Sequence, residues 1–215
     1  MVVPLVIFDM DGTLLACETL EVIAKEIGVV KEVKEITDAA MNGKLDFEEA
    51  VKMRLNLLRG IGVEKIVEIA HELPLMQGAQ RTINVLKKKG FKIGIITGGF
   101  ELVAEVIADK LGVDFFVANK LEVVGGVLTG EFKLNVNGNK DLLLRNAALH
   151  WGAKITVAVG DGANDIPMLK EADLGIGFNG KPVVVAAANK NIQNDLRNIL
   201  PIIDPIVQKF LNKVK

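Results

Sequence analysis

Three polar turns rich in aspartate and glycine hold the residues of this sequence best suited to chemistry. They are Asp9-Met-Asp11-Gly12-Thr13, Thr97-Gly98-Gly99 and Gly160-Asp161-Gly162-Ala-Asn164-Asp165. Together they supply four carboxylates, threonine hydroxyls and several backbone amides with little side-chain cover. Carboxylates crowded on one site repel each other unless a cation is present, and hard oxygen ligands beside a phosphate suit Mg²⁺. The turns therefore predict a magnesium site that handles phosphate.

Individual residues in these turns suggest a division of labour. Asp9 and Asp11 are two positions apart at the tip of an extended segment, so both can project into one cavity. Such a pair can split into an ionised nucleophile and a protonated general acid. Thr97 precedes two glycines and a predicted helix, which favours an anion site. Lys140, before another predicted helix, is a candidate point charge for phosphoryl transfer.

Each of the three turns follows a short apolar run that reads as a buried strand. These runs cover residues 2–8, 91–96 and 155–159, and predicted helices alternate with them from residue 75 onward. This alternation predicts an α/β fold, a Rossmann-like, mostly parallel sheet with helices on both faces. A β-hairpin is expected around Gly125-Gly126. Because ligands bind beyond the carboxyl ends of parallel strands, the three turns should converge.

The segment after the first turn has a different character. Residues 16–73 contain few glycines, many charges and apolar residues at helical spacing, which predicts a helical cap domain inserted into a core domain of residues 1–15 and 74–215. Asp46 and Glu49 resemble a capping box that opens a helix, with Gly60 expected to end it. Arg54 interrupts the apolar face of that helix. It either snorkels to solvent or points into a cavity and binds a carboxylate.

Composition removes several classes of function. Among 215 residues there is no serine and no tyrosine, one cysteine and a formal net charge of -1. These counts exclude serine hydrolase chemistry, internal disulfides and multi-cysteine metal sites, and they favour a reducing, cytoplasmic location. The charge balance favours neither nucleic acid nor membrane as a partner. Cys17 is expected to be an idle packed thiol, and His71 and His150 to be structural or solvated.

In their order along the chain, these motifs resemble those of the haloacid dehalogenase superfamily of phosphatases. The resemblance includes a helical cap after the first motif, and within the superfamily the chain is most similar to the phosphoserine phosphatases. It covers nearly the full length, including Glu18-Thr19, residues 41–47, Arg54 and residues 157–165. Two positions, Gly12 and Thr97, carry residues where that family often has serine.

The resemblance implies a mechanism in which Asp9 attacks phosphorus and forms an aspartyl-phosphate. Asp11 would protonate the leaving alcohol and then activate water. Mg²⁺ would be held by the Asp9 carboxylate, the Asp11 backbone carbonyl and the Asp161 carboxylate, with Asp165 ordering a metal-bound water. The implied substrate-binding residues are Glu18, Arg54, Thr97, Gly98, Lys140 and Asn164.

The implied reaction is Mg²⁺-dependent hydrolysis of O-phosphoserine, the last step of serine biosynthesis. In it Glu18 would hold the ammonium group and Arg54 the carboxylate of the amino acid. A phosphatase or phosphotransferase for another small phosphomonoester is the main alternative. A dinucleotide-binding oxidoreductase, suggested by G-x-G-x-x-G at residues 175–180, and a non-catalytic phosphate-binding module are less favoured. The roles of Met41, Phe47 and Cys17, and the choice between monomer and homodimer, stay open.

Overall fold

A seven-stranded sheet forms the centre of the molecule. The computed structural model describes residues 3–41 and 44–205. The strands lie in the order β4-β3-β2-β1-β5-β6-β7, and each neighbouring pair is parallel except β3 and β4. Their bounds are β1 (Val3–Phe8), β2 (Lys92–Phe100), β3 (Phe115–Val124), β4 (Val127–Lys133), β5 (Ala153–Gly160), β6 (Leu174–Phe178) and β7 (Lys190–Ile192). The predicted α/β class and the hairpin at Gly125-Gly126 are confirmed.

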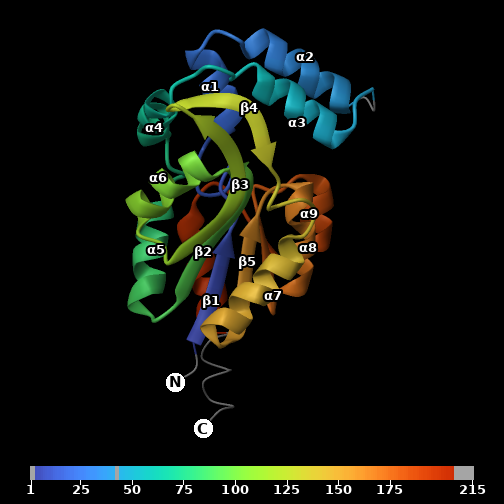
Figure 1. The fold of residues 1–215 in the computed structure, drawn as a ribbon. Coiled ribbons are helices and arrows are strands. Elements are labelled where there is room, and N and C mark those ends of the chain that lie inside the picture. Colours follow the sequence, from blue (N-terminus) through green and yellow to red (C-terminus); the bar gives the residue numbers. More distant parts are fainter. Residues whose placement is uncertain (1–2, 42–43, 206–215) are drawn as a thin grey trace.

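Helices cover both faces of the sheet, and a further group lies above its carboxyl edge (Figure 1). One face carries α5 (Ala79–Lys88) and α6 (Glu101–Leu111), and the other carries α7 (Lys140–Trp151), α8 (Ile166–Glu171) and α9 (Pro182–Ala187). Above the edge are α1 (Thr19–Glu26), α2 (Val30–Met41), α3 (Phe47–Asn56) and α4 (Val63–Glu72). Two short 3-10 turns are η1 (Ala163–Asp165) and η2 (Leu196–Ile199).

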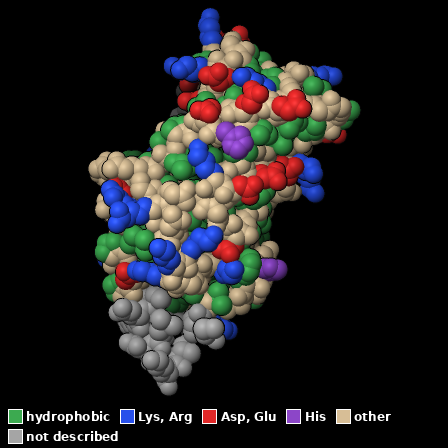
Figure 2. Space-filling view, turned by 90° about the vertical axis from the view of Figure 1, so that its left-hand side faces the viewer, with side chains coloured by type: hydrophobic (Ala, Val, Ile, Leu, Met, Phe, Trp, Pro, Cys, Tyr) green, Lys and Arg blue, Asp and Glu red, His purple; other side chains and the backbone are tan. Residues whose placement is uncertain are grey.

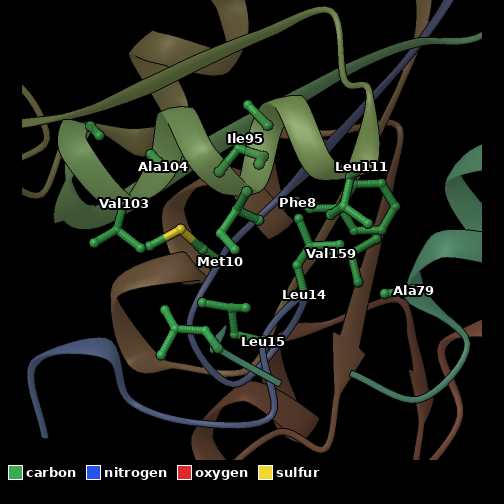
Figure 3. Close-up of a cluster of buried hydrophobic side chains, with 14 of the residues drawn as sticks. Phe8, Met10, Leu14, Leu15, Ala79, Ile95, Val103, Ala104, Leu111 and Val159 are labelled. Carbon is green, nitrogen blue, oxygen red and sulfur yellow. The ribbon is translucent and has the colours of Figure 1, made fainter. Parts of the chain in front are cut away.

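The hydrophobic core explains why β1 is an unbroken apolar run. Side chains alternate along a strand, so Val6 and Phe8 join one buried cluster while Leu5 and Ile7 join the other. The first cluster is shown in Figure 3, where Phe8 and Val159 lie with side chains from α5, α6 and the turn after β1. A strand buried on both faces needs no polar alternation. It ends at its first acid, Asp9, which places that carboxylate at the carboxyl edge.

The four helices between β1 and α5 are attached to the hairpin as well as to the chain. The Gly60 N–H donates to the Leu128 carbonyl (2.8 Å), and the Leu128 N–H donates to the Ile61 carbonyl (2.9 Å). The Val63 N–H likewise donates to Gly126 (2.9 Å). The α3–α4 connection therefore lies on the outer edge of β4. The helices predicted for residues 16–73 are present, whereas the division into cap and core domains stays a prediction.

Two boundaries differ from the sequence-based expectation. The strand expected to stop at residue 96 continues to Phe100 because Phe100 pairs with Asn119, after Ile96 has paired with Val117. Thr97-Gly98-Gly99 is thus a bulge within β2, opposite a single residue of β3. Helix α3 ends at Asn56 instead of reaching Gly60, because Gly60 is engaged by β4.

Tight packing accounts for the glycines of the G-x-G-x-x-G sequence. A Cβ atom on Gly175 would lie 2.1 Å from the Leu169 carbonyl oxygen, and one on Gly177 would lie 2.4 Å from Asn191 Oδ1. The sequence lies on β6 near the edge of the sheet and leads into α9, a helix of six residues. These glycines therefore allow the elements around β6 to pack closely. Their presence is explained by this packing without a bound nucleotide.

The molecular surface agrees with the small net charge. On the face seen in Figure 2, basic and acidic side chains are interspersed with apolar and uncharged ones. Such mixing is the usual pattern of a solvated surface. Within residues 3–41 and 44–205, no helix combines the length and the apolar character needed to cross a bilayer.

Candidate active site

A cavity of about 330 Å³ lies between the carboxyl ends of β1, β2 and β5 and the helices α1 and α3. Its size is in the range of small-ligand sites. The predicted site residues all line it except Asp165, which is fully buried. Those that line it are Asp9, Asp11, Glu18, Arg54, Thr97, Gly98, Lys140, Asp161 and Asn164. The three turns therefore converge as the sheet topology predicts.

The Lys140 ammonium joins two of the carboxylates beneath the cavity. Its Nζ lies 2.6 Å from Asp9 Oδ1 and 2.6 Å from Asp165 Oδ1, and the lysine side chain is only 1% exposed. Burial alone would lower the pKa of Lys140, but the two carboxylates outweigh burial and raise it. Burial raises the pKa of Asp9, against the opposing effect of Lys140. The charged Lys140 amine therefore pairs with two carboxylates, and all three groups are shielded from solvent.

Asp165 also shapes the third turn. Its Oδ2 accepts the backbone N–H groups of Asp161 (3.1 Å) and Gly162 (2.9 Å), which fixes the turn after β5. A Cβ atom on Gly160 would lie 2.5 Å from this carboxylate, so only glycine leaves room for it. Asp165 thus lies behind the cavity wall and orders the residues that form it.

An aspartate cluster able to hold a metal ion lies at the base of the cavity. Oxygens of Asp9, Asp161 and Asp165 lie within 4.8 Å of one another. Burial raises the pKa of Asp161 to about 6, and the negative charge of Asp165 adds to that effect. The Lys140 ammonium offsets only one of three negative charges. Hard oxygen donors with uncompensated charge fit a divalent cation such as Mg²⁺.

Asp11 lies apart from this cluster, at the N-terminus of α1. Its two carboxylate oxygens accept the Thr19 N–H (3.0 Å) and the Thr19 hydroxyl (2.5 Å). Burial raises the pKa of Asp11 to about 6, although both bonds from Thr19 oppose the shift. A carboxyl group with this pKa can exchange a proton near neutral pH. Thr19 was not identified from the sequence as the hydrogen-bond partner of Asp11. Its position at a helix start, eight residues after Asp11, was a signal for this contact.

Two side chains of opposite charge line the part of the cavity formed by the inserted helices. Arg54 on α3 is half-buried, and its Nε donates to the Ala50 carbonyl (3.1 Å). Glu18 precedes α1, and burial raises its pKa, with Lys181 opposing that shift. Neither forms an ion pair with any described residue. The part of the cavity next to α1 and α3 therefore contains an unpaired Arg54 guanidinium and an unpaired Glu18 carboxylate.

Other residues raised by the sequence lie away from catalysis or outside what is described. Burial, with the nearby Asp11 charge, raises the pKa of the Cys17 thiol to about 11, so it is a poor nucleophile. His71 and His150 lie in the last turns of α4 and α7, away from the cavity. The side chains of Met41 and Phe47 lie outside the described residues. Asn119 and Lys181 line the cavity and were missed.

Comparison with known proteins identifies the family to which this fold and cavity belong. The model for haloacid dehalogenase-like hydrolases matches residues 6–170. A phosphoserine phosphatase of Methanocaldococcus jannaschii is 41% identical over 204 residues, covering 93% of this chain and 97% of that protein. A phosphoserine phosphatase of Streptococcus thermophilus is 36% identical over 207 residues, covering 94% and 96%. A longer relative, phosphoserine phosphatase SerB2 of Mycobacterium tuberculosis, is 41% identical, and the match covers 47% of its length.

Solved structures agree with the sequence matches. A phospho-aspartyl intermediate analogue of phosphoserine phosphatase superposes with a TM-score of 0.84 at 41% identity, covering 94% of this chain and 99% of the other. A substrate-bound phosphoserine phosphatase complex superposes with a TM-score of 0.85 at 40% identity, with the same coverage. The fold, the order of the motifs and the family match lead to one conclusion: this chain belongs to the haloacid dehalogenase-like hydrolases.

Proposed function

We propose that this chain hydrolyses O-phosphoserine to serine and phosphate with the help of Mg²⁺. The observation that carries the proposal is the cavity itself. Its base holds the Lys140-bridged aspartates, and its other lining includes the unpaired Glu18 and Arg54. The phosphoserine phosphatases described above, similar over nearly the whole chain, support the same reaction.

The roles of the acids follow from their surroundings. Asp9 Oδ1 is engaged by Lys140, while Oδ2 has no hydrogen-bond partner among the described residues and is the atom we assign to attack on phosphorus. The P–O bond to serine then breaks, and Asp11 gives its proton to the departing oxygen. In the second half Asp11 takes a proton from the water that attacks the aspartyl-phosphate, which releases phosphate and restores Asp9.

Other residues of the site would hold the transferring phosphoryl group. The Thr97 hydroxyl, the Gly98 amide, Lys140 and Asn164 line the cavity and offer donors to its oxygens. The Asp9 and Asp161 carboxylates and the Asp11 backbone carbonyl would hold Mg²⁺. When bound, the ion supplies positive charge that offsets the carboxylates and the phosphoryl oxygens.

The amino-acid part of the substrate accounts for the unpaired charges of Glu18 and Arg54. A carboxylate can pair in bidentate fashion with the Arg54 guanidinium, and an ammonium group can pair with Glu18. A phosphomonoester without a carboxylate leaves the half-buried Arg54 guanidinium without a partner, which disfavours its binding. The cavity volume of about 330 Å³ also favours a small substrate.

Phosphate release from a panel of phosphomonoesters with Mg²⁺ tests the proposal. Wild type should prefer phosphoserine, and Asp9→Asn should abolish turnover of every compound. Asp109→Asn, an exposed change on α6, is the matched control and should retain activity. Activity surviving in Asp9→Asn would exclude the mechanism. Equal turnover of phosphoserine, phosphothreonine and sugar phosphates would exclude the substrate and favour a general small-molecule phosphatase.

We also propose the organisation and setting of the enzyme. Residues 16–73 form a cap over a core of residues 1–15 and 74–215, because α1 and α3 line the cavity from above the sheet edge. A cytoplasmic location is supported by the presence of a single cysteine. Release of serine makes the reaction suitable as the last step of serine biosynthesis.

A further inference from the structure

A buried asparagine links two separate walls of the cavity. Asn119 on β3 is 2% exposed and lines the cavity. Its Nδ2 donates to the Gly98 carbonyl (2.9 Å), and its Oδ1 accepts the N–H groups of Asn135 (2.8 Å) and Val136 (2.8 Å). One amide therefore ties the bulge of β2 to the segment that precedes Lys140.

The peptide between Gly98 and Gly99 is held at both of its ends. Asn119 holds the carbonyl of Gly98, and Thr97 Oγ1 accepts the N–H of Gly99 (2.9 Å). The Thr97 hydroxyl thus serves as an acceptor, and no described residue accepts its proton. A hydroxyl has a single proton to donate, so that proton is left for a ligand in the cavity.

The second link is to the segment that leads into Lys140. Val136 and the residues 137–138 that follow it line the cavity, and α7 begins at Lys140. The segment is internally bonded, because Asn139 Nδ2 donates to the Asn135 carbonyl (3.2 Å) and the Asn137 N–H donates to Asn139 Oδ1 (2.8 Å). Fixing residues 135 and 136 therefore fixes where this whole segment meets the bulge.

We propose that Asn119 is a positioning residue for phosphate, one that holds the Thr97 hydroxyl and the segment before Lys140 in the spacing a phosphoryl group requires. This proposal rests on the proposed function. The amide is needed because it donates and accepts at once. An aspartate at this position would turn an acceptor toward the Gly98 carbonyl. An alanine would leave unpaired the buried N–H of Val136 and the partly buried N–H of Asn135.

Phosphate affinity in the Mg²⁺-loaded protein is the test, measured by calorimetry with inorganic phosphate as the probe. Asn119→Asp and Asn119→Ala should each weaken phosphate binding about tenfold or more. Asn135→Ala is the matched control, since Asn135 Nδ2 joins the same segment to the Ala118 carbonyl (2.9 Å) without touching the bulge. It should change phosphate affinity less than about threefold. Equal effects of the Asn119 and Asn135 changes would overturn the proposal.

A double-mutant cycle with Thr97→Val separates positioning from mere loss of stability or added charge. If Asn119 acts through the Gly98-Gly99 peptide on Thr97, its removal should cost clearly less in the Thr97→Val background than in wild type. The same loss in both backgrounds would overturn the proposal. Should Asn119→Ala fail to fold, Asn119→Asp carries the same cycle. Because calorimetry needs no turnover, an inactive wild type would contradict the proposed function and leave this test intact.

Discussion

Replacing Lys140 by methionine should destabilise the metal-free protein strongly and in a pH-dependent manner. The ammonium lies 2.6 Å from each of two carboxylates whose side chains are 7% and 0% exposed, in Asp9 and Asp165 respectively. Methionine fills a similar volume without charge and leaves both acids buried and unpaired. Removal of one partner from a buried ion pair typically costs about 3–5 kcal/mol, and we expect that loss of unfolding free energy at pH 7.

The sign of the pH dependence follows from Asp9. Burial already raises its pKa, and Lys140 is the main group that opposes the shift. In Lys140→Met the folded-state pKa of Asp9 therefore rises further above its unfolded value. A raised carboxyl pKa contributes stability that is present below the unfolded pKa and is lost as pH rises through the folded pKa. The deficit of the variant should thus be small near pH 4 and grow toward pH 7.

Urea denaturation in EDTA at pH 4 and pH 7, followed by circular dichroism, measures both effects. Arg145→Met is the matched control, because Arg145 lies on the same helix and pairs with Glu171 at the exposed surface. That change should leave the unfolding free energy nearly unchanged at both pH values. A deficit for Lys140→Met below about 1 kcal/mol at pH 7, or an equal deficit at both pH values, would refute the reasoning.

Three further predictions follow from separate features. Arg54→Ala should raise KM for phosphoserine about tenfold or more while sparing an aryl phosphate, as judged by steady-state kinetics; equal losses on both would make Arg54 structural. Because the pKa of Cys17 is raised to about 11 from 9.0, iodoacetamide at pH 8 should modify the native thiol roughly 100-fold more slowly than the urea-unfolded one, and equal rates in mass spectrometry would contradict this. Burial raises the pKa of Asp161 to about 6, so protons compete with a metal there below that pH; Mg²⁺ should raise the melting temperature more at pH 7.5 than at pH 5, and a reversed order in calorimetry would count against the metal site.

The convergence of the three turns was predictable because it follows from local pattern and topology. The apolar run before Asp9 predicts a strand buried on both faces, and parallel strands bring their carboxyl ends to one edge. Asp161 and Thr97 follow similar runs, so they were expected at the same edge. The cap of α3 was also local, since the Asp46 carboxylate accepts the Glu49 N–H (2.8 Å) as the capping pattern predicts.

Contacts between distant segments were not predictable in the same way. The continuation of β2 to Phe100 depends on pairing with Asn119, and the end of α3 depends on β4. Neither boundary can therefore be predicted from the spacing of residues within the element itself. The bond from Thr19 to Asp11 requires the fold of α1 over the first turn. For Asn119 a signal existed, because an amide within an apolar strand must find hydrogen-bond partners once it is buried.

The attachment of the α3–α4 connection to the hairpin limits how the cavity can widen. The two places where the chain passes between the sheet and the inserted helices lie side by side, joined by the Ala16 N–H and the Pro74 carbonyl (2.9 Å). If the inserted helices were attached to the sheet only at this connection, they could rotate about it. The three backbone bonds to Gly126 and Leu128 form a second attachment, which restricts this rotation. Any widening of the cavity must therefore either break these three bonds or bend the inserted helices α1 to α3.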